Sequence, residues 1–265
     1  MKAILPSIFM FILAACATAQ SDLQQMSDTE KAFLQAVAEK GTRSAFLEFL
    51  ADDAILFRPT AINGKDFWKR EDDSSTAILV RNPTFADISS NGRIGYTTGN
   101  WRCYQKGKSE SEAEFGQYVT IWEKKPDGKY RAGLDIGITH EKLSFLQTNR
   151  VAAYNGEREL NEQGWSAADP SMNFLKMSMD HGTLGGAYQK FAAKDVRLLR
   201  DGAPPIIGKK NVVKATKQYV SIAFPRKMAL LESGDLAYVW NVCEFADSNE
   251  GREQGNCLHV WKLRD

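Results

Sequence analysis

The chain has 265 residues, of which 43% are hydrophobic and 11% aromatic, and its formal net charge is +1. This length favours one large domain or two modest ones, and the apolar content is enough for ordinary hydrophobic cores. A chain so close to neutrality, with short basic runs at 106–108 and 209–210, has no field that draws it to nucleic acid. We therefore expect a globular protein with no nucleic-acid partner.

The first 20 residues have the pattern of an export signal. Lys2 precedes an apolar run that is too short for a comfortable membrane span. The run ends in the letters LAAC, which resemble a bacterial lipobox, in which Cys16 is lipidated and becomes the first mature residue. The alternative is ordinary cleavage after Ala19. Both predict export, either as a lipoprotein of the periplasm or outer membrane or as a freely secreted protein, with the lipid as the only membrane contact.

From residue 27 onward the pattern predicts helices and then strands. Ser27 and Glu30 have the spacing of a capping box, so a helix is expected to begin there and to end at Gly41. A second short helix reaches residue 50. Downstream, the pattern predicts a strand at 54–58, a short helix at 65–70, and, where the apolar period changes to two, strands at 76–88, 93–104, 115–124 and 129–138. This order predicts an α+β unit in which helices pack on a curled antiparallel sheet.

The second half of the chain repeats this pattern, which predicts two tandem domains. Residues 27–140 form the first copy, 141–168 the connector and 169–265 the second copy. Tyr96 and Trp122 of the first copy correspond to Tyr238 and Trp261 of the second. The second copy lacks the strand that follows Trp122, and a truncated record, a borrowed strand and a degenerate domain are the alternatives. Truncation is the explanation we favour.

Five segments of the first copy resemble the nuclear-transport-factor-2-like (NTF2-like) superfamily, closest to its polyketide-cyclase-like (SnoaL-like) and calmodulin-kinase association-domain-like branches. They are ADDA at 51–54, NGKDFW at 63–68, GYTTGNW at 95–101, YVTIWEKKPDGKY at 118–130 and LDIG at 134–137. The resemblance implies two cone-shaped domains, each a curved sheet wrapped on its N-terminal helices, with the last strand of a complete domain interior to its sheet. It also implies a pocket between helix and sheet. Some members are cyclases, isomerases or dehydratases that use pocket acids, and others bind small molecules or dimerise through convex faces.

Asp135 is the most suggestive acid. Counting outward from the Asp127-Gly128 turn pairs it with Thr120, and the alternating apolar residues of the two strands are expected to face the helices. Asp135 then lies on the outer face, solvated or at a dimer contact. The alternative is a carboxylate beside aromatic rings whose pKa is raised and which acts as a general acid or base. Those apolar residues are Val119, Ile121, Leu134 and Ile136.

Two further residues are weak catalytic candidates, namely His140, as a partner of Asp135 or Asp53, and Asp53 itself; a surface position is the alternative. The predicted pocket residues are Tyr96, Thr98 and Asn100, which share the apolar parity, together with Trp68. The three histidines show no metal-ligand spacing, and no nucleotide or nucleophile motif is present. We expect neither a metal nor a cofactor.

Cys243 and Cys257 flank a polar loop centred near Glu250, so a hairpin is expected to place them directly opposite each other. We predict a disulfide between them, because disulfides persist in exported proteins, with two free thiols as the alternative. Cys103 has no evident partner and is expected to pack as a small apolar residue.

These patterns predict an exported protein that binds a small apolar molecule or serves as an assembly module, with a possible homodimer through the convex sheet faces. The alternative is a cyclase-, isomerase- or dehydratase-like enzyme with a pocket acid in the first domain.

Overall fold

The computed structural model describes residues 8–72, 77–105, 112–143, 166–179, 182–221, 228–247 and 251–263, without the side chains of 8–20 and Met228. The predicted connector, 141–168, therefore lies mostly outside the described residues. Within the described part of the chain, no helix has both the length and the apolar character needed to span a membrane.

The first domain begins with one long helix, α1 (Ile8–Lys40), rather than with a helix starting at Ser27. The predicted capping box is wrong, because Glu30 is buried in the domain and its carboxylate bonds to Thr97 and Tyr118 instead. The helix packs on the sheet from Leu23 onward, so removal of the predicted export segment leaves this packing intact. Gly41, with φ of 85°, ends α1 as predicted and leads into α2 (Thr42–Phe49).

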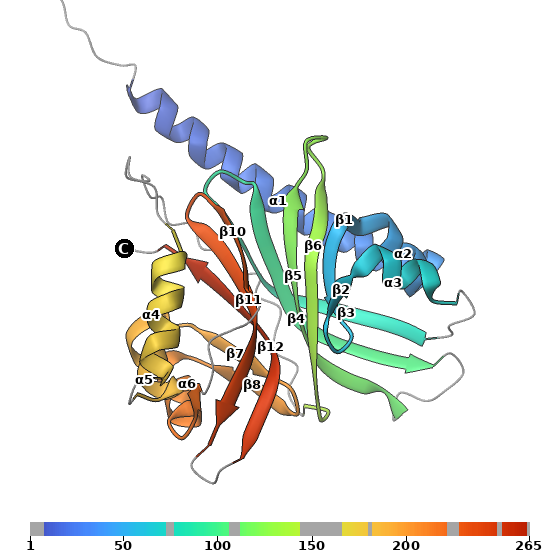
Figure 1. Ribbon diagram of the computed structural model, residues 1–265. Coiled ribbons are helices and arrows are strands. Elements are labelled where there is room, and N and C mark those ends of the chain that lie inside the picture. The colour runs from blue at the N-terminus through green and yellow to red at the C-terminus, as the bar shows by residue number, and fades with distance from the viewer. Residues whose placement is uncertain are drawn as a thin grey trace, which may run out of the picture.

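The strands of the first domain form one six-stranded sheet in the order β2-β1-β6-β5-β4-β3 (Figure 1). The last strand, β6, is interior and pairs in parallel with β1, as the resemblance implied. The predicted α+β class and the helix-on-sheet arrangement are thus confirmed. The elements are β1 (Leu50–Phe57), β2 (Ala61–Asn63), α3 (Gly64–Arg70), β3 (Ala77–Ile88), β4 (Ile94–Gln105), β5 (Glu114–Lys124) and β6 (Tyr130–His140).

The second half repeats the order of elements with a smaller sheet. Its main sheet runs β10-β11-β12, β9 also pairs with β11, and β7-β8 is a separate hairpin. Among the described residues, no strand lies beyond β12 in the place that β6 occupies beside β5. The elements are α4 (Ala168–Met179), α5 (Leu184–Phe191), β7 (Arg197–Arg200), β8 (Ala203–Ile207), α6 (Lys209–Thr216), β9 (Val220–Ser221), β10 (Met228–Ser233), β11 (Leu236–Ala246) and β12 (Arg252–Lys262).

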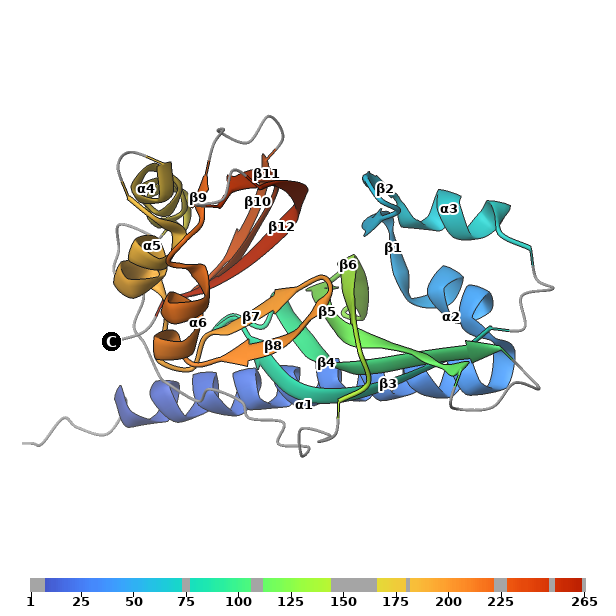
Figure 2. The same cartoon turned by 90° about the horizontal axis from the view of Figure 1, so that it is seen from below.

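The two halves pack through their sheets. Figure 2 shows α1 along one side of the first sheet and the second half on the opposite, outer side. Phe57 meets Trp240 edge to face, with ring centroids 5.7 Å apart. The prediction that the alternating apolar side chains of β5 and β6 face the helices is wrong. These side chains pack instead against β10, β11 and β12 of the second half. The first domain contributes Val119, Ile121, Leu134 and Ile136, and the second Leu231, Tyr238, Trp240, Leu258 and Val260.

Polar contacts fix the position of the second half against the first. The Lys262 ammonium lies 3.1 Å from Asp235 and 3.6 Å from Asp87, and it donates to the carbonyl of Ile88 at 2.6 Å. Asp235 also accepts from the backbone N–H of Ser90 at 2.7 Å. The Lys262 side chain is 9% exposed and its two carboxylate partners are 1% and 3% exposed, so this group is buried at the domain boundary.

The register of the β11-β12 hairpin is shifted by two residues from the prediction, since Ala246 pairs with Arg252. Cys243 therefore lies opposite Gly255 and Cys257 opposite Asn241. The expected direct opposition of the two cysteines is wrong, and both are free thiols in the structure. Cys103 is half-buried and also free.

Replacing Lys262 by methionine is expected to lower the free energy of unfolding by about 3–5 kcal/mol, because two buried carboxylates lose their cation. Urea unfolding of the full chain measures the change. Lys31→Met is the matched control, since the Lys31–Asp28 pair is exposed and worth about 1 kcal/mol or less. Equal losses in the two variants would contradict the assigned role of Lys262.

Candidate functional site

The helix-facing side of the first sheet carries a buried cluster of charged and polar side chains. Strand alternation brings Tyr118, Thr120 and Trp122 of β5 to this side, and Asp135 of β6 pairs with Thr120. Gly116 of β5 leaves space for the Trp101 ring on this side, because a Cβ at Gly116 would lie 2.5 Å from that ring. This face, together with α1, is where the resemblance places a ligand pocket.

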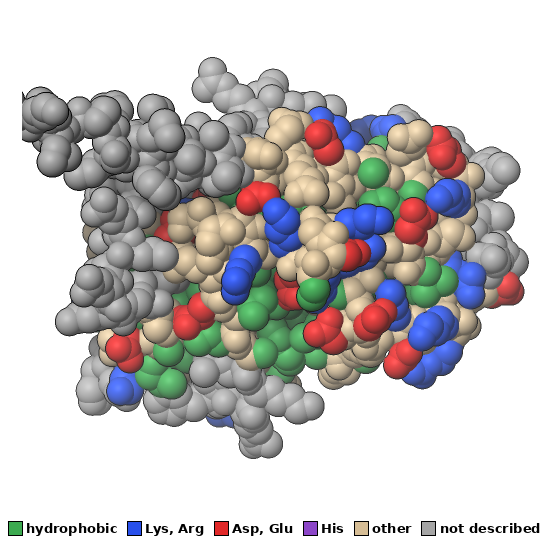
Figure 3. All heavy atoms as spheres, turned by 90° about the horizontal axis from the view of Figure 1, so that it is seen from above, with side chains coloured by type: hydrophobic (Ala, Val, Ile, Leu, Met, Phe, Trp, Pro, Cys, Tyr) green, Lys and Arg blue, Asp and Glu red, His purple; other side chains and the backbone are tan. Residues whose placement is uncertain are grey.

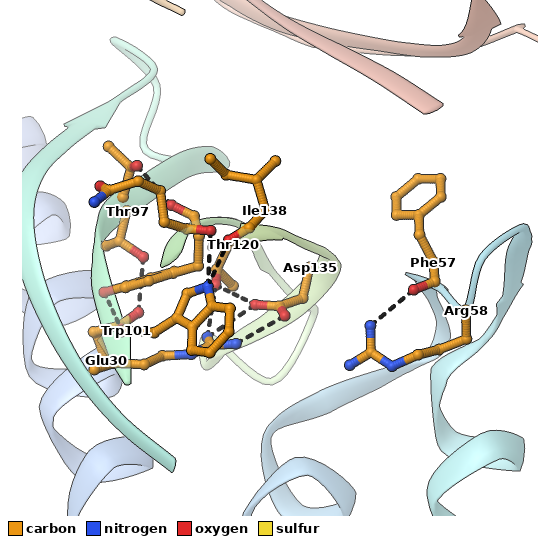
Figure 4. Close-up of polar contacts among 12 residues, drawn as sticks. Glu30, Phe57, Arg58, Thr97, Trp101, Thr120, Asp135 and Ile138 are labelled. Carbon is orange, nitrogen blue, oxygen red and sulfur yellow. Dashed lines mark hydrogen bonds and ion pairs between the residues drawn. The ribbon is translucent and has the colours of Figure 1, made fainter. Parts of the chain in front are cut away.

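Arg81 of β3 forms a two-pronged ion pair with Asp135. Its Nη1 and Nη2 lie 2.9 and 2.8 Å from the two carboxylate oxygens, and both side chains are 6% exposed. The Thr120 hydroxyl donates to Asp135 at 2.5 Å and accepts from Arg81 at 3.2 Å. The guanidinium also lies 4.4 Å from the centroid of the Tyr118 ring. Both oxygens of the carboxylate therefore accept hydrogen bonds from the protein itself, as Figure 4 shows for Asp135 and Thr120.

Glu30 of α1 brings a second carboxylate to the cluster. It accepts from the Thr97 hydroxyl at 2.7 Å and from the Tyr118 hydroxyl at 2.9 Å, and Trp122 Nε1 donates to Thr97 at 2.9 Å. Burial raises the pKa of Glu30, and the positive charge of Arg81 partly opposes that rise. Burial likewise raises the pKa of Tyr118 well above its usual value, with Glu30 adding to the effect. One guanidinium thus lies among two carboxylates, and the Glu30 carboxyl is the group that favours the neutral form.

The cavity beside this cluster is very small. It has a volume of about 10 Å³ and is lined by aromatic and aliphatic side chains with Arg81, Thr120 and Asp135. A volume of this size holds one water molecule at most. The remaining lining residues are Phe33, Phe46, Phe49, Leu50, Trp122 and Ala132.

The predicted outer position of Asp135 is wrong. The pairing of Asp135 with Thr120 is as predicted, but this face of the strands is turned towards α1 and not towards solvent. The polar alternation suggested exposure because the partners of these groups, Arg81 and Glu30, lie far away in sequence. The alternative position, a carboxylate beside aromatic rings, is the one that the structure shows.

The predicted pocket residues do not come together. Three of them, Tyr96, Thr98 and Asn100, lie on the same face of the sheet as Val119 and Ile121, as predicted. That face is the outer one, which is turned away from α1. Thr98 is buried and donates to the carbonyl of Tyr118 at 2.6 Å, and Asn100 accepts from Gln117 at 2.5 Å. Trp68 lies on the other side of the sheet, stacked on Phe46 at 4.8 Å.

The weaker acid–base candidates lie apart from the cluster. Asp53 is 83% exposed and lies 3.6 Å from Lys125. His140 contacts Gln117 at 3.3 Å and the carbonyl of Glu141 at 2.7 Å, and neither contact involves Asp135 or Asp53. Arg58 bonds to the carbonyl of Phe57 and is separate from Asp135 in Figure 4.

The corresponding face of the second domain has different chemistry. His259, at the place of Thr120, packs against Phe174 and Trp261, and burial lowers its pKa to about 4, so its imidazole is neutral. Among the described residues of the second domain, no strand pairs with β12 in the place of β6 and none supplies a counterpart of Asp135. Within the described residues, no group of three His, Cys, Asp or Glu side chains is arranged to hold a metal ion.

Comparisons with known proteins extend only to solved structures, since no family model and no curated protein matches the chain. A putative scytalone dehydratase from Novosphingobium aromaticivorans is 12% identical, with a TM-score of 0.38, and covers 54% of this chain and 99% of its own. A ketosteroid isomerase-like protein from Erwinia carotovora is 13% identical, with a TM-score of 0.36, and covers 44% and 95%. An NTF2-like superfamily protein from Salmonella enterica is 12% identical, with a TM-score of 0.37, and covers 49% and 98%.

Each of these chains matches about half of this one over nearly its whole length. The dehydratase and isomerase activities in the names are said of those proteins. The sequence resemblance to the NTF2-like superfamily concerns the fold, which the sheet order and helix placement of the first domain bear out.

Sequence reasoning missed Arg81 and Glu30, the two residues that define the cluster. Each is a single charge in an otherwise apolar pattern: Arg81 interrupts the strand letters AILVRNPTF, and Glu30 lies in line with Met26, Phe33 and Val37 on the buried side of the helix. A charge at a position that the period assigns to the core was the available signal.

Glu30→Gln is expected to change how stability depends on pH. The folded pKa of Glu30 is raised above its usual value of 4.5, so its contribution to stability is fully present below that pH and is lost as pH rises through the folded pKa. The variant therefore becomes more stable relative to the wild type as pH rises from acidic to neutral. Urea unfolding across that range measures this.

Glu39→Gln is the matched control on the exposed side of the same helix. A stability difference between Glu30→Gln and the wild type that stays constant with pH would contradict the buried, raised-pKa carboxylate.

Proposed function

We propose that the chain is an exported, non-catalytic assembly module of two NTF2-like units, in which the helix-facing side of the first unit is a structural core and not a ligand pocket. The observation that carries this proposal is the filled cavity. Pockets for small molecules have volumes of about 300–1,000 Å³, whereas the cavity of the first domain measures about 10 Å³.

The hydrogen bonds support the same conclusion. An acid that acts on a substrate must reach it, but both oxygens of Asp135 are held by Arg81, and the carboxylate of Glu30 is held by Thr97 and Tyr118. A substrate would have to displace these partners and separate α1 from the sheet. The buried charges thus serve the packing of the first domain.

The surface is consistent with an assembly role and with the absence of a nucleic-acid partner. On the face drawn in Figure 3, acidic and basic side chains are interspersed, and hydrophobic side chains gather between them. The outer sheet faces of the two units already contact each other within the chain. A homodimer through these faces, which stays a prediction, would require the units to separate.

The competing function is an isomerase-, cyclase- or dehydratase-like enzyme, and one observation favours it. Glu30 and Asp135 flank the same guanidinium, and the raised pKa of Glu30 is the property of a general acid. That enzyme requires an open form of the first domain, in which α1 or α2 has moved.

A thermal-shift screen on the full chain separates the two proposals. It uses steroid-like, polyketide-like and other small apolar compounds, because a ligand that binds the folded state raises the melting temperature. We expect no compound to give a saturable rise.

Any compound that binds is then tested against two matched variants. Thr120→Val changes the lining of the cavity, and Thr29→Val changes a residue on the far side of α1. A saturable rise that Thr120→Val abolishes and Thr29→Val retains would overturn the assembly proposal in favour of a first-domain pocket.

A further inference from the structure

Two thiols of the second domain lie next to each other on the side of the sheet that faces α4 and α5. Cys243 of β11 pairs with Gly255, and Cys257 of β12 pairs with Asn241, so the two cysteines are diagonal neighbours on one face. The Cys243 thiol donates to Asn241 Oδ1 at 2.7 Å, and the Cys257 thiol is the first cause of its raised pKa. Both are free thiols in the structure.

The two thiols differ in accessibility. Cys243 is 4% exposed, whereas Cys257 is half-buried. The contact with Cys257 and the burial of its own side chain raise the pKa of Cys243 well above its usual value, so it stays a thiol. Since the thiolate is the attacking form, Cys257 is the sulfur that a reagent meets and that reacts first.

We propose that Cys243 and Cys257 form a reversible disulfide by exchange with a small-molecule disulfide such as glutathione disulfide. The Cys257 thiolate attacks one sulfur of the reagent, forms a mixed disulfide and releases one glutathione thiolate. Cys243 then loses its proton and attacks the Cys257 sulfur, which releases the second glutathione. Two protein thiols are oxidised and one glutathione disulfide is reduced to two glutathione molecules.

The diagonal register makes this bond strained and therefore easy to reduce. Diagonal neighbours in an antiparallel pair lie about 7–8 Å apart, whereas the Cα atoms of a disulfide lie about 4.4–6.8 Å apart. Closing the bond requires β12 to shift towards β11 near these residues. The shift is sterically open, because a Cβ at Gly255 would meet nothing within 4 Å and residues 252–255 are exposed.

The disulfide would join β12, an edge strand of the second sheet, to its neighbour β11. β12 pairs with β11 on one edge, and no strand of the described residues pairs with its other edge. A covalent link from β12 to β11 restrains this edge strand in oxidising conditions and releases it in reducing ones. The proposal is independent of whether the first domain holds a ligand.

The test uses the full chain carrying Cys16→Ser and Cys103→Ser, equilibrated over a series of reduced-to-oxidised glutathione ratios, alkylated and mapped without reduction by mass spectrometry. We expect a peptide pair joined through Cys243 and Cys257 with the loss of two hydrogens, which opens again as reduced glutathione increases. Adding Cys243→Ser is expected to trap a glutathione adduct on Cys257, whereas adding Cys257→Ser leaves Cys243 unmodified.

Absence of the joined peptide pair at every ratio, with Cys257 alkylated throughout, would overturn the proposal. So would a glutathione adduct on Cys243 in the Cys257→Ser variant, because it would reverse the assigned order of attack. A joined pair that resists a large excess of reduced glutathione would contradict the strained, reversible bond and indicate a permanent structural disulfide.

Discussion

The first domain depends on one buried guanidinium. Arg81 joins β3 to β6 through Asp135 and also lies over the ring of Tyr118, whose hydroxyl bonds to Glu30 of α1. An unpaired charge in this position would be very costly, so the helix and the distant strands must close around it together. The same closure fills the space that otherwise would be a pocket. The stability of the first domain and the small size of its cavity therefore both follow from the burial of Arg81.

The second constraint is that both faces of the first sheet are covered. α1 covers one side, and the second domain covers the other through Trp240, Tyr238 and the buried Lys262 (Figures 1 and 2). The outer face of one cone therefore serves as the contact surface for the other. Each sheet thus shields apolar surface that the other would expose by itself.

The sequence predicted most strands of the first domain and the pairing of Thr120 with Asp135, because periodicity and the turn at Asp127-Gly128 are local signals. It did not predict the start of α1 or the register of β11 and β12. The sequence did not predict which face of the first sheet the helices cover. A sheet with one covered face shows a clean alternation, but here the alternation marks two covered faces, one apolar and one with buried polar groups. Asp135 was misplaced for this reason. Its partner Arg81 lies 54 residues away in the sequence, so no local pattern connects the two.

A double-mutant cycle on Arg81 and Asp135 tests most directly whether the cluster is a structural core. The free energies of unfolding of Arg81→Met, Asp135→Leu and the double variant are measured by urea unfolding at the same pH. The account predicts that each single variant loses about 3–5 kcal/mol and that the double variant recovers most of the loss, because apolar side chains can replace a buried ion pair. Small, additive losses would contradict it, since they would mean that Arg81 and Asp135 are not held together in the folded protein.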